Sequence, residues 1–283
     1  MSLREAIGDR RGAVLVAPAV VAVLFVLGAG LGSAVLQSVG LIPLVGDPAL
    51  QFTGYVGERE VLAAVGLSLL IASASTSVAA LVGLSTALLL VGSGRGRRML
   101  AALVTASIPV PHLVGAASVG LLLSDSGLMS RWLGVPAQAW PSLVAGAWPT
   151  AVIFEYAWKE SAFVALVVSA SLASRLPDYQ ETAALLGARP WARFRHVALP
   201  LATPALLAAS AIAFVYTLGS YEVAWLLGAA YPEPLPVLSY RLFTSTDLTA
   251  RPDAMAVAVM TTFIAGSVAL TALALLRRTA AWR

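Results

Sequence analysis

The chain has 283 residues, of which 59% are hydrophobic and only 11% are charged, and its mean hydropathy is +0.86. This composition lies far from that of soluble globular proteins and indicates a protein that crosses the lipid bilayer several times. The absence of cysteine excludes disulfides, thiolate zinc sites, iron–sulfur clusters and cysteine nucleophiles. The formal net charge is +4. We expect no nucleic-acid binding, because the basic residues lie at the boundaries of apolar segments and form no single face with interleaved aromatics.

Apolar segments long enough to cross a bilayer recur along the chain. A spanning helix needs about 20 predominantly apolar residues to cross roughly 30 Å of hydrocarbon. The sequence therefore predicts an all-α, polytopic membrane protein with six transmembrane helices. The predicted spans cover residues 13–36, 61–91, 99–123, 142–173, 201–227 and 254–276.

The distribution of arginine predicts how these spans are oriented. Most arginines lie in the amino terminus, in the loops that follow the second and fourth spans, and in the carboxyl terminus. The loops on the other side carry only Arg59, Arg131, Arg241 and Arg251. Because basic residues favour the cytoplasmic side of a membrane, we expect both termini and the loop after the fourth span to lie in the cytoplasm.

The loop at 175–200, between the fourth and fifth spans, is polar and rich in arginine. Asp178 and Glu181 have the spacing of a capping box, and Gly187 suits the left-handed residue that ends a helix, so a short helix is predicted here. A helix of about nine residues is marginal by itself in water and must pack against something. A groove on a partner protein would suit it. The bilayer surface and the ends of its own subunit's spans are alternatives, and physical reasoning alone leaves all three open.

The same loop resembles the EAA motif of the permease subunits of ABC importers, and we refer to residues 175–200 as the EAA loop. It departs from the pattern at Thr182, where the family usually has alanine. The resemblance implies a MetI-like type I permease fold in which this loop is a coupling helix that docks on a separate ATPase subunit. The matching positions are Glu181, Ala183, Gly187, Phe194, Val197, Leu199 and Pro200. The residues expected to serve ATPase coupling are Asp178, Glu181, Ala183, Ala184, Gly187, Phe194, Leu199 and Pro200.

The resemblance also implies the partners and the domain organisation. We expect two ABC ATPase subunits, a second permease subunit (a different chain or a copy of this one) and an extracytoplasmic solute-binding protein, in the inner membrane of a bacterium. The permease domain is expected at 57–277, after a first span and external loop within 1–56 and before a cytoplasmic tail at 278–283. External loops at 40–60, 124–141 and 229–253 would receive the binding protein, although their composition equally suits inert connectors.

The chain lacks the residues needed to bind and hydrolyse ATP. A P-loop requires a glycine-rich turn followed by lysine and serine or threonine. The only lysine, Lys159, lies inside an apolar segment. We therefore expect no catalysis and no cofactor in this chain, with ATP bound by the partner subunit.

Ionisable residues inside the predicted spans are functional candidates, because they are costly in hydrocarbon. Glu155 and Lys159 are four residues apart and can neutralise each other along one helix face. Such a pair could position the fourth span, or it could face a translocation pathway. His112, which follows Pro111, is interpreted as a group that packs or satisfies a helix break rather than as a ligand.

The fifth predicted span contains Gly219, which permits a bend at membrane depth. Candidate residues for a substrate path surround it: Tyr216, Tyr221, Glu222 and Trp225. The alternative is an interfacial aromatic belt with Glu222 near the membrane surface. The sequence is more similar to the polyamine, thiamine and iron branch of the family than to the sugar branch, although aromatic residues also suit carbohydrate. A secondary transporter or channel that works without ATP, and a membrane scaffold, are the rival functions; no convincing internal repeat favours the former.

Overall fold

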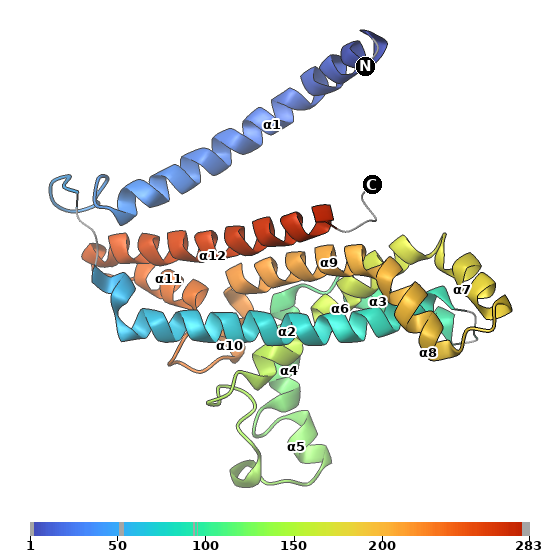
Figure 1. The fold of residues 1–283 in the computed structure, drawn as a ribbon. Helices are drawn as coiled ribbons and strands as arrows, with labels where there is room; N and C mark the ends of the chain where they lie inside the picture. The colour runs from blue at the N-terminus through green and yellow to red at the C-terminus, as the bar shows by residue number, and fades with distance from the viewer. Residues whose placement is uncertain (1–2, 51–53, 93, 95, 279–283) are drawn as a thin grey trace.

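The computed structural model describes residues 3–50, 54–92, 94 and 96–278. Parts of the expected external loop at 40–60 and of the expected tail at 278–283 lie outside the described residues. Every regular element of the described part is a helix, which confirms the predicted all-α class. Figure 1 shows long helices running side by side, with the amino-terminal helix inclined away from them and a smaller lobe projecting from the opposite side. The long helices are α1 (Leu3–Ser38), α2 (Arg59–Val91), α6 (Thr150–Leu172), α9 (Leu199–Gly219) and α12 (Arg251–Arg278).

Five stretches of the described chain are long and apolar enough to cross a membrane: Val14–Ser38, Arg59–Val91, His112–Trp132, Pro190–Gly219 and Leu248–Arg277. The predicted fourth span corresponds to α6, which has 23 residues but carries Glu155, Lys159 and Glu160 and is therefore less apolar. Its predicted start at 142 is wrong, because the helix begins only after Pro149.

The predicted third span, 99–123, is wrong as a continuous helix. It is divided into α3 (Arg97–Ser107) and α4 (His112–Leu123). Pro109 and Pro111 lie between them, and proline lacks the N–H that an uninterrupted helix requires. With α5 (Leu128–Trp132), α4 forms the lobe that projects from the long helices in Figure 1.

The predicted fifth span, 201–227, is also interrupted. The expected bend at Gly219 is confirmed, because α9 ends there and a separate helix, α10 (Glu222–Leu227), follows. The predicted external loop at 229–253 is not irregular throughout, since it contains α11 (Leu235–Phe243). Leu235 and Leu238 of α11 are fully buried, so this helix is part of the core.

The core is built on close contact between α2 and α6. The buried face of α2 consists mainly of small residues, which let helix backbones approach closely. At Gly83, an added Cβ atom would lie 2.6 Å from Cγ1 of Val164 on α6, so this crossing requires glycine. Small buried residues of α2 are Ala64, Ser68, Ala72, Ser75, Thr76, Ala79, Gly83 and Ala87.

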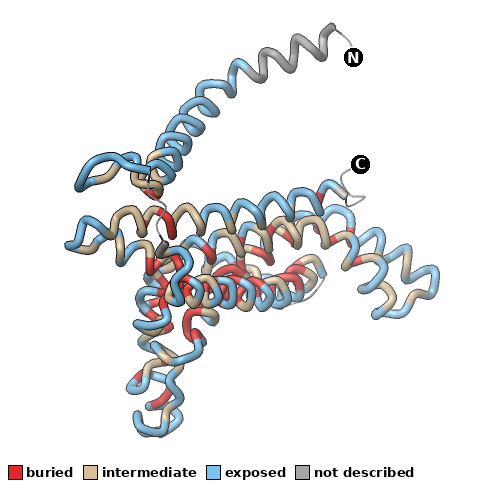
Figure 2. The backbone as a smooth tube through the Cα atoms, turned by 60° about the vertical axis from the view of Figure 1, so that its left-hand side comes forward, coloured by how far each residue is buried: buried red, intermediate tan, exposed pale blue. Residues whose placement is uncertain are grey.

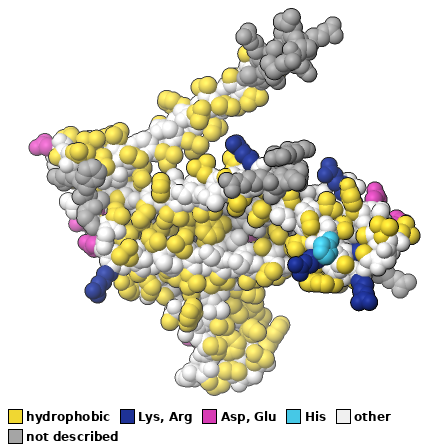
Figure 3. Space-filling model, in the orientation of Figure 1, with side chains coloured by type: hydrophobic (Ala, Val, Ile, Leu, Met, Phe, Trp, Pro, Cys, Tyr) yellow, Lys and Arg dark blue, Asp and Glu magenta, His cyan; other side chains and the backbone are white. Residues whose placement is uncertain are grey.

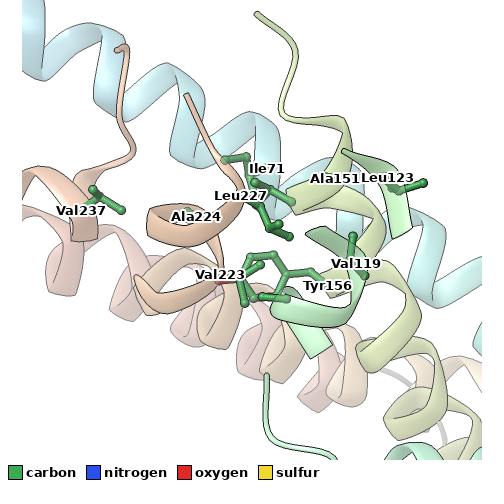
Figure 4. Close-up of a cluster of buried hydrophobic side chains, with 11 residues drawn as sticks. Ile71, Val119, Leu123, Ala151, Tyr156, Val223, Ala224, Leu227 and Val237 are labelled. Atoms are coloured by element: carbon green, nitrogen blue, oxygen red, sulfur yellow. The ribbon is translucent and has the colours of Figure 1, made fainter. Parts of the chain in front are cut away.

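A second group of buried side chains holds the interrupted helices in place. Figure 4 shows Ile71, Val119, Tyr156 and Leu227 converging from α2, α4, α6 and α10. The broken spans are therefore positioned by tertiary packing.

Burial is concentrated where α2, α6 and α9 meet, whereas α1 is exposed from residue 14 to residue 32 (Figure 2). Apolar side chains such as Leu15 and Phe25 face outward, and burial begins only near the carboxyl end of α1, where Ser38 is buried. Such a surface suits contact with lipid tails or with another membrane subunit.

Candidate functional site

The EAA loop folds into two short helices, α7 (Leu176–Leu185) and α8 (Pro190–Arg193), followed by a wider turn at Phe194–Ala198 that leads into α9. The predicted helix is confirmed, but the predicted capping box is wrong. The helix begins two residues before Asp178, because Pro177 fits the first turn, where no N–H is needed. Asp178 thus lies inside the first turn, and its backbone carbonyl accepts a bond of 2.9 Å from the hydroxyl of Thr182.

The end of α7 follows the prediction for Gly187. Its φ is +80°, in the left-handed region that favours glycine. The N–H of Gly187 donates to the carbonyl of Ala184, and the N–H of Ala188 donates to that of Ala183, each at 2.9 Å. These two bonds form a Schellman motif, which satisfies the last carbonyls of the helix and turns the chain toward α8.

The EAA loop has a buried side and an exposed side. Leu176 and Ala198 are buried in a cluster with α6 and α9. Leu185 and Leu186 are each 83% exposed, and Trp191 is also exposed. Figure 3 shows basic and acidic side chains around exposed hydrophobic ones at the end of the molecule where α7 and α8 lie. The subunit therefore presents an apolar surface with a charged rim outside the predicted spans.

The predicted coupling residues are distributed over both sides of the loop. Asp178, Glu181, Ala184, Gly187 and Pro200 are exposed, whereas Ala183, Phe194 and Leu199 are partly buried. Between α7–α8 and the end of α2 is a cavity of about 410 Å³, lined by residues that include Leu88, Gln180 and Phe194. The cavity lies beside Leu176, Pro177 and Gln180, on the side of α7 that faces the rest of the subunit.

A separate polar cluster lies where α6 passes the break between α3 and α4. The ammonium group of Lys159 donates to the carbonyls of Ser107 and Val110, each at 2.5 Å, and lies 3.5 Å from that of Ile108. In the described structure Lys159 therefore binds backbone carbonyls, and the predicted pairing with Glu155 is replaced by this contact. The helix break is satisfied by Lys159 rather than by His112.

Glu155 pairs instead with His112, the first residue of α4. Nδ1 of His112 lies 3.2 Å from Oε1 of Glu155, and its Nε2 lies 3.7 Å from Oε1 of Glu160. Glu155 is fully buried, and the rings of Tyr156 and Tyr216 lie next to the imidazole, with centroids 5.9 and 4.9 Å away. The structure thus brings Glu155 and Tyr216 together with Glu160 and with His112, which was interpreted from the sequence as a packing or break-satisfying group.

The remaining path candidates lie at and after the end of α9. Tyr221 stacks on Tyr240 of α11, with ring centroids 4.8 Å apart, and both line an outer groove of about 500 Å³ between α9, α11 and α12. Glu222 is partly exposed in the first turn of α10, and Trp225 is exposed on the same helix. Glu222 nevertheless lies close enough to Tyr216 and Tyr156 to interact with them electrostatically, so it is not remote from the cluster around His112.

A polar network near the start of α2 was not expected from the sequence. Arg241 of α11 binds Glu60 at 2.6 Å and Glu233 at 2.5 Å, and the Tyr55 hydroxyl donates to Glu60 at 2.7 Å. Burial, together with the bond to Glu60, raises the pKa of Tyr55, so its hydroxyl remains a donor at neutral pH. The network ties α11 to α2, and the only sequence signal for it was the isolated arginine in a predicted loop.

Comparison with known proteins identifies the family. The family model described as "binding-protein-dependent transport system inner membrane component" matches residues 79–280, which is most of the chain. The chain belongs to this family. It is 30% identical over 187 residues to a probable sulfate transport permease, cysT, of Marchantia polymorpha, covering 66% of the chain and 63% of the relative. It is 29% identical over 215 residues to the putrescine transport permease PotI of Escherichia coli, covering 75% of the chain and 70% of the relative.

Solved structures share the fold of this family member. A bacterial ABC transporter involved in alginate import has a TM-score of 0.71 at 20% identity, with 98% of this chain and 99% of that chain covered. The MetNI methionine ABC transporter in an inward-facing form has a TM-score of 0.60 at 17% identity, with 81% and 99% covered. These matches confirm the predicted MetI-like permease fold.

Proposed function

We propose that the chain is the transmembrane permease subunit of an ATP-driven importer, with the EAA loop as its contact with the ATPase. The observation that carries this proposal is the EAA loop itself, a short helix that is buried at its root and exposes Leu185 and Leu186. Two exposed leucines are unfavourable in water, and they suit a groove on a partner protein. In this arrangement both termini lie in the cytoplasm of a bacterium. In support, the amino end of α1 and the carboxyl end of α12 both point in the direction in which α7 and α8 lie (Figure 1).

The complete importer would contain two ATPase subunits, a second permease subunit, and an extracytoplasmic binding protein that delivers the solute. The exposed apolar length of α1 supports a further membrane subunit. ATP would be bound and hydrolysed by the partner, and closure of the ATPases would move the two EAA loops. An ATP-independent secondary transporter or channel is the rival, and it predicts uptake without any ATPase.

For the solute, we infer either a cation of the polyamine, thiamine or iron type, or a carbohydrate. Relatives transport solutes as different as sulfate and putrescine, so similarity does not select one. The charged groups inside the predicted spans are mainly acidic: they include Glu155, Glu160 and Glu222, while the ammonium of Lys159 is occupied by backbone carbonyls. An oxyanion requires donors, whereas ammonium and hydroxyl groups can bind carboxylates.

The proposal is tested by solute uptake in cells that make the chain with or without its partner ATPase. We expect uptake to fall to background when the ATPase is absent or carries a disabled P-loop. The solute retained by the purified neighbouring binding protein supplies the substrate for the assay. Persistent uptake without a functional ATPase would support the secondary transporter or channel instead.

A further inference from the structure

The α3–α4 break leaves particular carbonyl groups without their helical donors. In a continuous helix, the N–H of Pro109 would serve the carbonyl of Thr105, and that of Pro111 would serve Ser107, but proline has no N–H. The Thr105 carbonyl is reached by the N–H of Ile108 at 3.3 Å. The Ser107 carbonyl is reached by Lys159 at 2.5 Å. A side chain of α6 therefore replaces the donor that Pro111 cannot provide.

The other side of the break is held by the same helix. Glu155 lies one turn before Lys159 on α6 and pairs with His112, the first residue of α4. The carboxyl end of a helix is partially negative and the amino end partially positive, so Lys159 at the end of α3 and Glu155 at the start of α4 both have the favourable sign. Gly115 makes room for this contact, because an added Cβ atom would lie 2.7 Å from Oε1 of Glu155.

The helix that holds the break leads directly into the EAA loop. From Thr150 to Leu172, α6 contains neither proline nor glycine, so nothing in its sequence favours a kink. Only three residues separate it from α7. Leu172 of α6 and Leu176 of α7 are both buried in one cluster with Val168 and Ala198. A displacement of α7 is therefore passed to α6 by direct packing.

We propose that Lys159 and Glu155 are positioning residues that make the α3–α4 break a hinge driven by α6. This inference rests on the proposed function, because the drive is the movement of α7 by the ATPase. When α7 moves, α6 shifts, and Lys159 and Glu155 pull the facing ends of α3 and α4 with it. The lobe of α4 and α5 then changes its angle to the long helices. Neither side chain has to touch the solute.

The hinge can be tested with the assembled transporter, because the natural chain has no cysteine and two introduced cysteines can be spin-labelled specifically. One label replaces Leu133, which is exposed directly after α5, and the other replaces Ser174, which is exposed between α6 and α7. The distance distribution is measured by pulsed electron paramagnetic resonance with and without ATP and vanadate. In the otherwise wild-type transporter we expect the distribution to shift on nucleotide binding.

Lys159→Met removes the donors while retaining the length of the side chain, and Lys159→Arg retains donors and charge. We expect Lys159→Met to abolish the nucleotide-dependent shift and to lower uptake by about tenfold, within the range typical of coupling between sites. ATPase retention should be unchanged. Lys159→Arg should restore the shift. Where Lys159→Met does not reach the membrane, Gly115→Ala decides the matter, since it displaces Glu155 without altering charge and should reduce the shift.

The outcomes separate this inference from the function on which it rests. A wild-type transporter that retains its ATPase but shows no shift, or a Lys159→Met variant with the wild-type shift, overturns the hinge and leaves the importer intact. If Lys159→Met does not reach the membrane, an unchanged shift in Gly115→Ala overturns the hinge in the same way. A chain that retains no ATPase and transports without one overturns the importer function itself.

Discussion

Replacing Gly187 with valine is expected to lower uptake by about tenfold or more while the chain still inserts into the membrane. Gly187 has a φ of +80°, and a β-branched residue in this region costs about 1–3 kcal/mol. Apart from its two chain neighbours, no atom of the described residues lies within 4 Å of the position where its Cβ would be, so backbone strain rather than a clash produces the effect. The strain would open the Schellman motif and misplace the exposed end of α7. Solute uptake, normalised to the amount of chain in the membrane, measures the change.

Gly187→Asn is the matched control for this variant. Asparagine tolerates the left-handed region and adds a side chain of similar size, so uptake should remain close to that of the wild type. Equal uptake by the valine and wild-type proteins would show that the geometry of this turn has no part in coupling.

Leu186→Asp is expected to weaken retention of the ATPase by about thirtyfold or more, as at the central residues of protein interfaces. Leu186 is 83% exposed in the isolated subunit, so the stability of the subunit itself should change by no more than about 0.5 kcal/mol. Burial of the new carboxylate against the partner would be costly without a basic group to pair with it. The measurement is the amount of ATPase that co-purifies with the solubilised chain.

Leu44→Asp provides the control, because Leu44 is also an exposed leucine but lies in the loop after α1, away from α7. Its ATPase retention should match that of the wild type. If both variants lose the ATPase equally, the effect is general damage. If neither loses it, the exposed leucines of α7 are not part of the contact.

Hydropathy predicted where the long helices lie, but not where they break. Proline interrupts the hydrogen bonds of a helix because it has no N–H. A hydropathy average over about 20 residues does not register this interruption, so Pro109 and Pro111 were included in a predicted span. The opposite error occurred at α11, which was placed in an external loop although it directly follows Pro234 and has Pro236 as its second residue. Both lie at the start of the helix, where proline is tolerated.

Local chemistry at the EAA loop was predicted more fully than the polar cluster in the membrane. The left-handed conformation of Gly187 follows from a turn that local sequence determines. The partner of Lys159 does not, because the spacing of Glu155 and Lys159 on one helix says nothing about the carbonyls of a neighbouring broken helix. Tertiary packing determines which helix lies beside α6, and that neighbour supplies the carbonyls that Lys159 binds.

The most direct test of the contact with the ATPase is the reactivity of a single cysteine at position 182, introduced as Thr182→Cys on the exposed part of α7. We predict that a membrane-impermeant maleimide labels this cysteine from the cytoplasmic side only, and that bound ATPase protects it. Labelling from outside the cell, or labelling at the same rate with and without the ATPase, would contradict the account.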